Sequence, residues 1–446
     1  MKGFVPTPVD VVDYIVNQLF RNYRPSSELR LLDPGCGDGA FIEGVLRWCI
    51  KHRTPIPSIV GIDSDPRKIK RARKNLRQFS EVSLLCADFL AVQLEPFDFI
   101  VGNPPYVPIE DLSDAERREY RKRFLTASGR MDLYLMFWER SIELLRPNGR
   151  VVFITPEKFT YVETARPLRV LMAKSQIEFI HFASENTFPG LTTYPAITSV
   201  RRRRPERKTG IALRNGDHRQ VLLPTNGESW QGEIKGSPKI SGPITLADAS
   251  ERVSCGVATG ADSVFLFSSV NLPKGFKRFS HPTVGGRELS IGKPLNRPSR
   301  RLVVPYDKQN GLLPLNSLGD LREYLRRRDI RTRLQRRSCA QHKPWYAFHE
   351  TPPLAQMLQP KILCKDIAAQ PYFWLDSVGD IVPLHSVYYI VPKSTEMLDS
   401  LLEYLNSNIV GEWLRSNCQA AANGFIRIQS SVLKKLPLPQ DLIRTG

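Results

Sequence analysis

The sequence predicts an α/β protein, with a doubly wound, Rossmann-like sheet in the first half and a separate α+β domain in the second. Three observations support this fold class. Short apolar strands alternate with helical patterns over about the first 200 residues, as in βαβ units on a parallel sheet. Acidic or amide side chains follow four of these strands. The alternation stops near Arg201, and 446 residues exceed what one ordinary core accommodates.

The first elements follow from their apolar patterns. Residues 29–32 predict a strand, and a glycine-rich turn leads from it into a helix over 40–51 with apolar side chains on one face. Residues 59–62 predict a second strand and 82–86 a third, with a strongly basic helix over 66–79 between them. These strands end at Asp33, Asp63 and Asp88.

The sheet is expected to continue with strands at 97–101, 151–154, 177–182 and 196–200 and a helix over 132–145. Asn103 comes directly after the first of these strands. Ligands of doubly wound sheets bind at the carboxyl ends of the strands. The three aspartates and Asn103 are therefore candidate site residues.

Beyond Arg201 the pattern is irregular. Arginines at 201–204 lead into a polar, glycine-rich stretch, which predicts a linker over 205–242 between domains at 1–204 and 243–446. In the second domain we expect helices over 318–337 and 398–416. Short strands are expected at 264–266, 301–304, 361–363, 372–375 and 386–390.

The charge is strongly positive and uneven. The net charge is +19, and residues 1–200 contribute +3 of it against +16 from residues 201–446. Such an excess indicates a polyanionic partner, either nucleic acid or an anionic membrane surface. No apolar run reaches the roughly 18–20 residues of a membrane span, and the N-terminus shows no signal-peptide pattern. The seven cysteines are scattered, without a CxxC pair, so we expect a cytoplasmic protein with neither a disulfide framework nor a metal site.

The turn at 33–39, DPGCGDG, carries the first chemical motif. Its glycines let the backbone approach a ligand closely, but it is not the GxGxxG fingerprint and lacks the Lys-Ser/Thr of a phosphate-binding loop. An acidic residue before the turn suits an ammonium or hydroxyl group. Asp63 could accept hydrogen bonds from a ribose and Asp88 from an adenine amino group. One such aspartate alone would favour a structural role as a strand-end cap, but three in succession favour a ligand site.

The second motif is Asn103-Pro104-Pro105-Tyr106. The prolines stiffen the backbone, and the Asn103 side-chain oxygen and the Pro104 carbonyl could both accept hydrogens from one amino group. Tyr106 would offer a flat face on which a base can stack.

These motifs, in this order, resemble the gamma class of S-adenosylmethionine-dependent DNA adenine-N6 methyltransferases, the TaqI-type modification methylases. The resemblance also includes FVPTPVDVV at 4–12, ADFL at 87–90, DLYLMFWE at 132–139, TPEKF at 155–159 and TFP at 187–189. Asp33 stands where the TaqI-type enzyme has Glu. Fainter similarity over 256–439 implies that the second domain is a DNA target-recognition domain.

The resemblance implies residue roles. Thr7, Asp33, Gly35 and Gly37 would hold the methionyl part of the cofactor, Asp63 its ribose, and Asp88 and Phe89 its adenine. Asn103, Pro104, Pro105 and Tyr106 would form the catalytic loop, and Phe188 would stack with Tyr106 on the target base. Basic clusters could bind DNA phosphates, and from them we select Arg201, Arg202, Arg326, Arg327 and Arg331.

The expected activity is therefore methylation of N6 of a flipped-out adenine in double-stranded DNA, by a monomer whose cognate restriction endonuclease, if any, is a separate protein. Cytosine-N4 methylation uses the same geometry, although its loop more often begins with Ser. Methylases of release-factor glutamine or ribosomal guanine-N2 share the Asn-Pro-Pro-Tyr type of loop, but they explain neither residues 4–12 nor the large basic second domain. A non-catalytic specificity module would have lost the loops. The DNA sequence recognised does not follow from these patterns.

Overall fold

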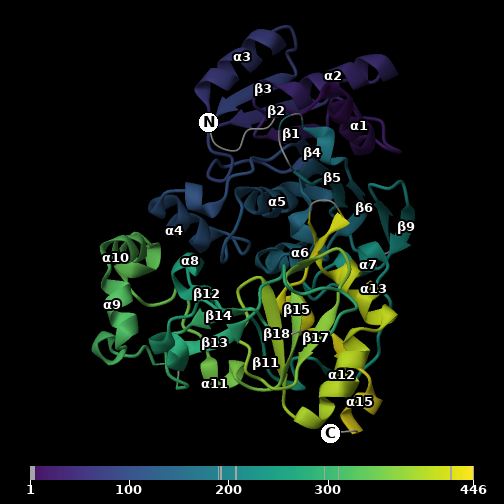
Figure 1. Ribbon diagram of the computed structural model, residues 1–446. Helices are drawn as coiled ribbons and strands as arrows, with labels where there is room; N and C mark the ends of the chain where they lie inside the picture. The colour runs from purple at the N-terminus through teal and green to yellow at the C-terminus, as the bar shows by residue number, and fades with distance from the viewer. Residues whose placement is uncertain are drawn as a thin grey trace. The chain divides into compact units, whose positions relative to one another are not determined.

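The computed structural model describes residues 6–188, 190, 193–205, 208–295, 297–309, 311–421 and 424–444. Phe4, Val5 and Pro189 of the sequence motifs lie outside the described residues. The chain forms two compact units, residues 1–234 and residues 235–446 (Figure 1).

The first unit is built on a nine-stranded sheet of order β3-β2-β1-β4-β5-β7-β6-β8-β9. Strands β1 to β5 are parallel, and β7 runs antiparallel to both of its neighbours, β5 and β6. The strands are β1 (Arg30–Pro34), β2 (Ser58–Asp63), β3 (Val82–Cys86), β4 (Phe97–Gly102), β5 (Leu145–Pro156), β6 (Gln176–Phe182), β7 (Pro195–Arg201), β8 (Thr209–Ala212) and β9 (His218–Val221). The predicted doubly wound sheet is confirmed.

Helices cover both faces of this sheet, because alternate strand residues point to opposite sides. In β4, Phe99 and Val101 pack on one face, whereas Ile100 packs on the other. The first face is covered by α1 (Val9–Leu19), α2 (Ala40–His52) and α3 (Pro66–Leu76). The second is covered by α5 (Leu133–Leu144) and α6 (Arg166–Met172), and α4 (Asp114–Arg123) adds Tyr120 to the same core.

The predicted linker over 205–242 differs from the structure. Its strands β8 and β9 extend the sheet beyond β6, and Trp230 and Ile234 are buried in the first unit's core. The buried guanidinium of Arg169 also donates to the carbonyls of Gly227 and Glu228. Four-residue strands at a sheet edge bury few side chains, so this polar segment lacks the apolar run that reveals an interior strand.

The second unit contains a four-stranded antiparallel sheet of order β11-β18-β15-β17 and a three-stranded sheet of order β12-β14-β13. The two faces of the larger sheet pack into separate cores. The strands are β10 (Ile244–Thr245), β11 (Ser250–Cys255), β12 (Leu266–Ser268), β13 (Ser280–Thr283), β14 (Arg300–Val303), β15 (Lys361–Lys365), β16 (Ile367–Ala368), β17 (Phe373–Asp376), β18 (Val387–Pro392), β19 (Gln419–Ala420), β20 (Ile426–Arg427) and β21 (Pro437–Leu438). The helices are α7 (Gln231–Lys235), which spans the boundary, α8 (Asp262–Phe265), α9 (Asp320–Arg326), α10 (Arg328–Gln335), α11 (Leu354–Met357), α12 (Leu398–Leu405), α13 (Asn408–Asn417), α14 (Ser430–Leu433) and α15 (Gln440–Arg444).

Both long helices predicted in this unit are broken. Arg327 adopts an extended backbone between α9 and α10, and Ser407 does the same before α13. At each break, two successive buried or half-buried apolar residues are five positions apart in the sequence, Leu325 and Ile330 in one case and Leu405 and Val410 in the other. A step of five leaves one face of a continuous helix, so a break lets both halves bury their apolar stripes. The strand predicted at 264–266 is wrong, because α8 occupies most of it.

The boundary at residue 234 also revises the distribution of charge. Residues 1–234 carry 35 basic and 28 acidic side chains, a net of +7, and residues 235–446 carry 29 and 17, a net of +12. The second unit keeps the larger excess, by a smaller margin than the predicted boundary suggested. Within the described part of the chain, no helix combines the length and apolar character needed to cross a bilayer.

Candidate active site

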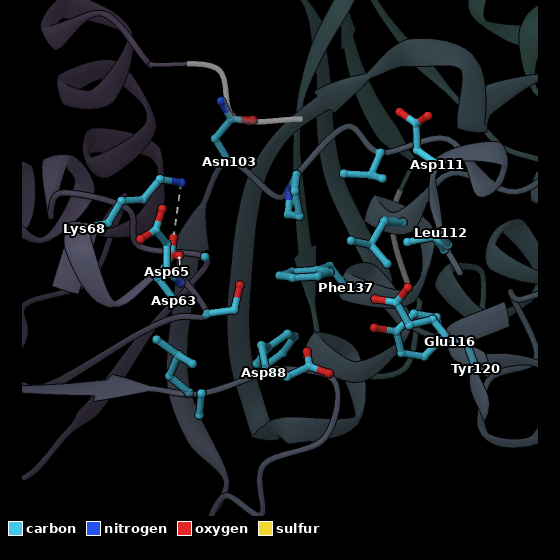
Figure 2. A pocket seen from close by; sticks show the side chains of 18 residues that line it. Asp63, Asp65, Lys68, Asp88, Asn103, Asp111, Leu112, Glu116, Tyr120 and Phe137 are labelled. Carbon is cyan, nitrogen blue, oxygen red and sulfur yellow. Dashed lines mark hydrogen bonds and ion pairs between the residues drawn. The ribbon is translucent and has the colours of Figure 1, made fainter. Parts of the chain in front are cut away.

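A cavity of about 400 Å³ lies at the carboxyl ends of β2, β3 and β4 in the first unit (Figure 2). This edge includes the junction of β1 and β4, where the strand order reverses, which is the usual ligand site of doubly wound sheets. Six of the predicted site residues line the cavity: Gly35, Asp63, Asp88, Phe89, Asn103 and Pro105.

The glycine turn after β1 closes one end of the site. Gly35 and Gly37 have φ angles of 80° and 58°, a region that favours glycine. The amides of Gly35 and Cys36 donate to the Ile62 carbonyl at 2.7 and 2.8 Å, which holds the turn against the end of β2. A Cβ on Gly102 would lie 2.9 Å from Oδ1 of Asp33, so the glycine at the end of β4 leaves room for that carboxyl.

Asp33, at the start of the glycine turn, does not line the cavity and is only 1% exposed. Among the described residues, neither of its carboxyl oxygens has a hydrogen-bond partner. Burial raises the pKa of Asp33 well above its usual value, and repulsion from Asp63 raises it further. An unpaired buried carboxyl is costly, so this one suits a cationic partner.

Asp63 is held in place from three directions. Its carboxylate accepts hydrogen bonds from the backbone amides of Gly37 at 3.0 Å and Asp65 at 2.8 Å. Nζ of Lys68, from the first turn of α3, lies 3.6 Å from Oδ2 of Asp63, and both side chains are buried (Figure 2). The position and orientation of this carboxylate are therefore fixed by the protein.

Asp88 and Phe89 begin the loop after β3. Asp88 Oδ1 accepts a hydrogen bond from the Leu90 amide at 2.9 Å. The rings of Phe89 and Phe137 are 4.9 Å apart at 46°, and the Arg140 guanidinium lies 5.4 Å from the Phe89 ring centre. Two aromatic rings beside a carboxylate can bind a purine, with the rings against its face and the carboxylate at its amino edge.

Asn103 connects two parts of the sequence that are 96 residues apart. Its Nδ2 donates to Oγ1 of Thr7 at 3.1 Å, which brings the predicted N-terminal motif to the loop after β4. This hydrogen bond sets the orientation of the Asn103 amide at the rim of the cavity. Pro104 is buried beside it.

Tyr106 and Phe188 lie beside each other, and their stacking on a target base stays a prediction. Their ring centres are 6.4 Å apart at 80°, and the Tyr106 hydroxyl donates to the Ile154 carbonyl at 3.4 Å. Burial raises the pKa of Tyr106 above its usual value, so its hydroxyl stays protonated. Phe188 is itself buried in the core beneath the loop. Neither ring lines the cavity itself.

An ion pair between the partly exposed Arg214 and the buried Glu157 supports this part of the site. The guanidinium of Arg214, between β8 and β9, pairs with Glu157 and donates to the Ala183 carbonyl. It also lies 5.2 Å from the ring centre of Tyr194. Arg214 thus connects the segment after β5 with both ends of the loop that carries Phe188. No sequence pattern pointed to Arg214, because it lies in the segment predicted as a linker.

Several other residues that line the cavity were not predicted: Lys68, Asp111, Leu112, Glu116, Tyr120 and Phe137. Phe137 lies inside the DLYLMFWE motif, which could have identified it. Lys68 belongs to a helix with many basic residues and could not be distinguished from them. The other four come from a segment without a recognisable motif.

The predicted DNA-binding arginines fall into two groups. Arg201 ends β7 and Arg202 follows it, so both lie at the end of the sheet opposite the cavity, because β7 is antiparallel to β5. Their guanidinium groups donate to the backbone carbonyls of Asn148 and Glu143. The structure therefore gives them a structural role, and it lends no support to the prediction that they bind DNA phosphates.

The other three arginines are exposed in the second unit. Arg327 lies 5.8 Å from the ring centre of Tyr324 and pairs with Asp329, and Arg331 lies 5.6 Å from the ring centre of Trp345. Arg326 ends α9. An open hollow on α10 is lined by Arg328, Asp329, Thr332, Arg333 and Arg336.

Comparison with known proteins finds similarity in both units. Residues 49–188 match the family model described as Eco57I restriction-modification methylase, and residues 321–438 match the model of the TaqI-like C-terminal specificity domain. The first match includes Asp63, Asp88 and the loop at 103–106.

The relatives cover most of the chain. It is 28% identical to type II methyltransferase M.PaeR7I of Pseudomonas aeruginosa, over 98% of this chain and 86% of the relative. It is 25% identical to M.XhoI of Xanthomonas vasicola, over 98% and 91% of the two chains. Among solved structures, the type IIL restriction-modification enzyme MmeI, determined in complex with DNA, has the same fold with a TM-score of 0.64. That match has 16% identity and covers 96% of this chain and 66% of MmeI.

Proposed function

We propose that this chain, which the comparisons support as an S-adenosylmethionine-dependent methylase of the restriction–modification type, methylates N6 of an adenine flipped out of duplex DNA. One observation carries the proposal above all. The Asn103–Tyr106 loop follows β4 directly, and Asn103 lines the cavity with its amide held by Thr7. The type II DNA methyltransferases that resemble the chain over almost its whole length support DNA as the substrate.

The residues that line the cavity fit the cofactor, together with Asp33, which does not line it. Asp33 has the buried, unpaired carboxyl that a methionyl ammonium group would neutralise. Asp63, held by two backbone amides, would accept from the ribose hydroxyls. Asp88, Phe89 and Phe137 would bind the adenine. A volume of about 400 Å³ lies within the range of small-molecule sites.

The catalytic task of the protein is to present an amine to the methyl group. When bound, S-adenosylmethionine supplies that methyl on a cationic sulfur. The Asn103 side-chain oxygen and the Pro104 carbonyl would each accept one N–H of the target amine, which favours its pyramidal, attacking form. Pro104 and Pro105 fix the backbone, so these acceptors need little reorganisation during the reaction.

The target base must leave the duplex to reach this loop, at a cost of a few kcal/mol. Stacking on an aromatic side chain contributes roughly 1–3 kcal/mol per base. Tyr106 belongs to the loop and Phe188 lies beside it, so stacking on these rings would offset part of the cost. Arg214 would act as a positioning residue, because it holds the segments that flank Phe188.

In the second unit, the DNA backbone would lie against the exposed arginines of α10. Arg328, Arg333 and Arg336 line the same hollow, whereas Arg327 and Arg331 lie over aromatic rings. Arg337 is excluded, because its guanidinium already donates to the carbonyls of Thr259, Trp345 and Ala347. Such phosphate contacts would orient the unit on DNA without reading its sequence.

Cytosine-N4 methylation is the alternative, since its target is also an exocyclic amine. The Asn at the first position of the loop favours adenine. The test is transfer of labelled methyl from S-adenosylmethionine to duplex DNA, followed by digestion and analysis of the nucleosides. We expect the label in N6-methyladenine. Label in N4-methylcytosine would overturn the choice of base, and label in protein or RNA would overturn the proposed substrate.

A further inference from the structure

One wall of the cofactor cavity comes from a segment to which neither the sequence motifs nor the proposed mechanism assigns a role. It lies between the Asn103–Tyr106 loop and α5, and it contains a 3-10 turn at Ile109–Asp111 followed by α4. Its lining residues are Asp111, Leu112, Glu116 and Tyr120. In Figure 2 they face Asp63 and Lys68 across the cavity, with Phe137 and Asp88 between the two sides.

This wall is anchored to the loop that carries Asp88. Arg123, in the last turn of α4, donates to the Leu90 carbonyl at 2.5 Å, and Arg140 of α5 donates to the same oxygen at 3.1 Å. The residues after α4 are also fixed, because the buried carboxylate of Glu139 accepts from the amides of Leu125 and Thr126 at 2.9 and 2.8 Å. The C-terminal end of α4 and the Asp88 loop therefore form a continuous network.

Tyr120 is the aromatic residue that α4 contributes to the cavity. Its side chain is only 8% exposed and packs with the same core as Phe137. Burial, together with the nearby carboxylates of Asp88 and Glu116, raises the pKa of Tyr120 to about 12, so the ring stays neutral at physiological pH. A neutral ring next to Asp88 adds apolar surface where the adenine would bind.

We propose that Tyr120 is a cofactor-binding residue and that α4 covers the adenosyl part of the cavity, with Arg123 as the tether that retards cofactor release. Because Glu116 and Tyr120 of α4 line the same cavity as Asp88 and Phe89, a ligand seated against Asp88 and Phe89 also contacts the cover. The inference rests on the cofactor and does not depend on which base is methylated.

The test measures binding of S-adenosylmethionine and S-adenosylhomocysteine to the full chain without DNA, by titration calorimetry and stopped-flow displacement. We expect Tyr120→Ala to weaken both ligands about tenfold, which corresponds to about 1.4 kcal/mol. Tyr120→Phe should bind nearly as well as the wild type, because the contact is the ring. Lys122→Ala, which changes an exposed residue of the same helix, is the matched control.

The tether has a separate readout. Arg123→Ala should accelerate cofactor dissociation several-fold, and Arg123→Lys, which keeps one donor, should restore part of the difference. Tyr120→Ala and Arg123→Ala variants that bind and release the ligands like Lys122→Ala would overturn the proposal. If Tyr120→Ala fails to fold, the dissociation rate of Arg123→Ala decides alone. Failure of the wild type to bind either ligand would instead contradict the cofactor assignment.

Discussion

Asp33 provides a demanding prediction, because a single substitution should move stability and function in opposite directions. Its carboxyl is 1% exposed and has no hydrogen-bond partner among the described residues. Burial and the neighbouring Asp63 raise its pKa above the usual value. Asp33→Asn keeps the size of the side chain and removes the charge.

The sign of the stability effect follows from this shift. The folded protein disfavours the ionised carboxyl, so the group lowers stability progressively as the pH rises from its unfolded pKa to its higher folded pKa. Each unit between the two pKa values corresponds to about 1.4 kcal/mol at neutral pH. Asp33→Asn should therefore increase the free energy of unfolding by the amount that the buried ionised carboxyl costs. For a unit of this size, each kcal/mol of added stability raises the melting temperature by about 2–4 °C.

Cofactor binding should change in the other direction. A hydrogen bond to a charged group is worth about 1.5–3 kcal/mol, so loss of the Asp33 carboxylate should weaken S-adenosylmethionine roughly 10- to 150-fold. Binding of a cation lowers the pKa of a carboxyl, so the wild type should release protons on binding and bind more tightly as the pH rises towards the raised pKa. Thermal melts and calorimetry in buffers of different ionisation enthalpy measure both effects.

The control is Asp38→Asn, in the same turn, where the carboxylate is partly exposed and pairs with Arg71. Asp38→Asn should change the melting temperature by no more than about 1–2 °C, because exposed ion pairs contribute little to stability. It should also leave cofactor affinity unchanged. The reasoning about Asp33 is refuted if Asp33→Asn leaves both melting temperature and cofactor affinity at wild-type values.

Four further predictions concern the catalytic loop and the DNA surface. Asn103→Ala should reduce methyl transfer roughly 10²- to 10³-fold in single-turnover assays and leave cofactor binding within a few-fold; retained turnover contradicts its role as amine acceptor. Tyr106→Ala should diminish the fluorescence increase of 2-aminopurine placed at the target base, and an undiminished signal excludes stacking on this ring. Arg214→Ala should lower kcat and the 2-aminopurine signal, with partial rescue by Arg214→Lys, while the cofactor Kd stays unchanged; a loss confined to thermal stability would show a structural role only. Replacing Arg328, Arg333 and Arg336 together by Ala should reduce the magnitude of the slope of log DNA affinity against log salt concentration by about 2.7. Arg202→Ala is the control and should leave the slope unchanged. An unchanged slope in the triple variant would remove α10 from the proposed DNA surface.

Much of the candidate site was predictable from the sequence, because ligands of doubly wound sheets bind at the carboxyl ends of the strands. Asp63, Asp88 and Asn103 each follow a short apolar run, and the parallel order of β1 to β4 brings all three to one edge. Thr7 was predicted from resemblance alone, and its hydrogen bond to Asn103 places it at that edge. These residues could be identified without knowing any side-chain contact.

The remaining residues depend on contacts that sequence patterns do not record. Tyr120 reaches the cavity from a charged helix, and Arg214 acts from a strand pair at the sheet edge that buries little apolar surface. The charge of Arg201 and Arg202 suggested a DNA surface, but both donate to backbone carbonyls. The break at Arg327 could have been predicted from the five-residue spacing between the apolar residues Leu325 and Ile330. The many arginines around them made this spacing hard to recognise.

The central claim is that the chain methylates adenine N6 at a defined DNA sequence. Its most direct test is base-resolution methylation sequencing of genomic DNA from cells that express either the wild type or Asn103→Ala in an otherwise unmethylated background. The wild type should place N6-methyladenine at nearly every copy of one short sequence, and Asn103→Ala should leave those sites unmodified. Expression of the wild type without N6-methyladenine, or with methylation on cytosine N4 instead, would contradict the claim.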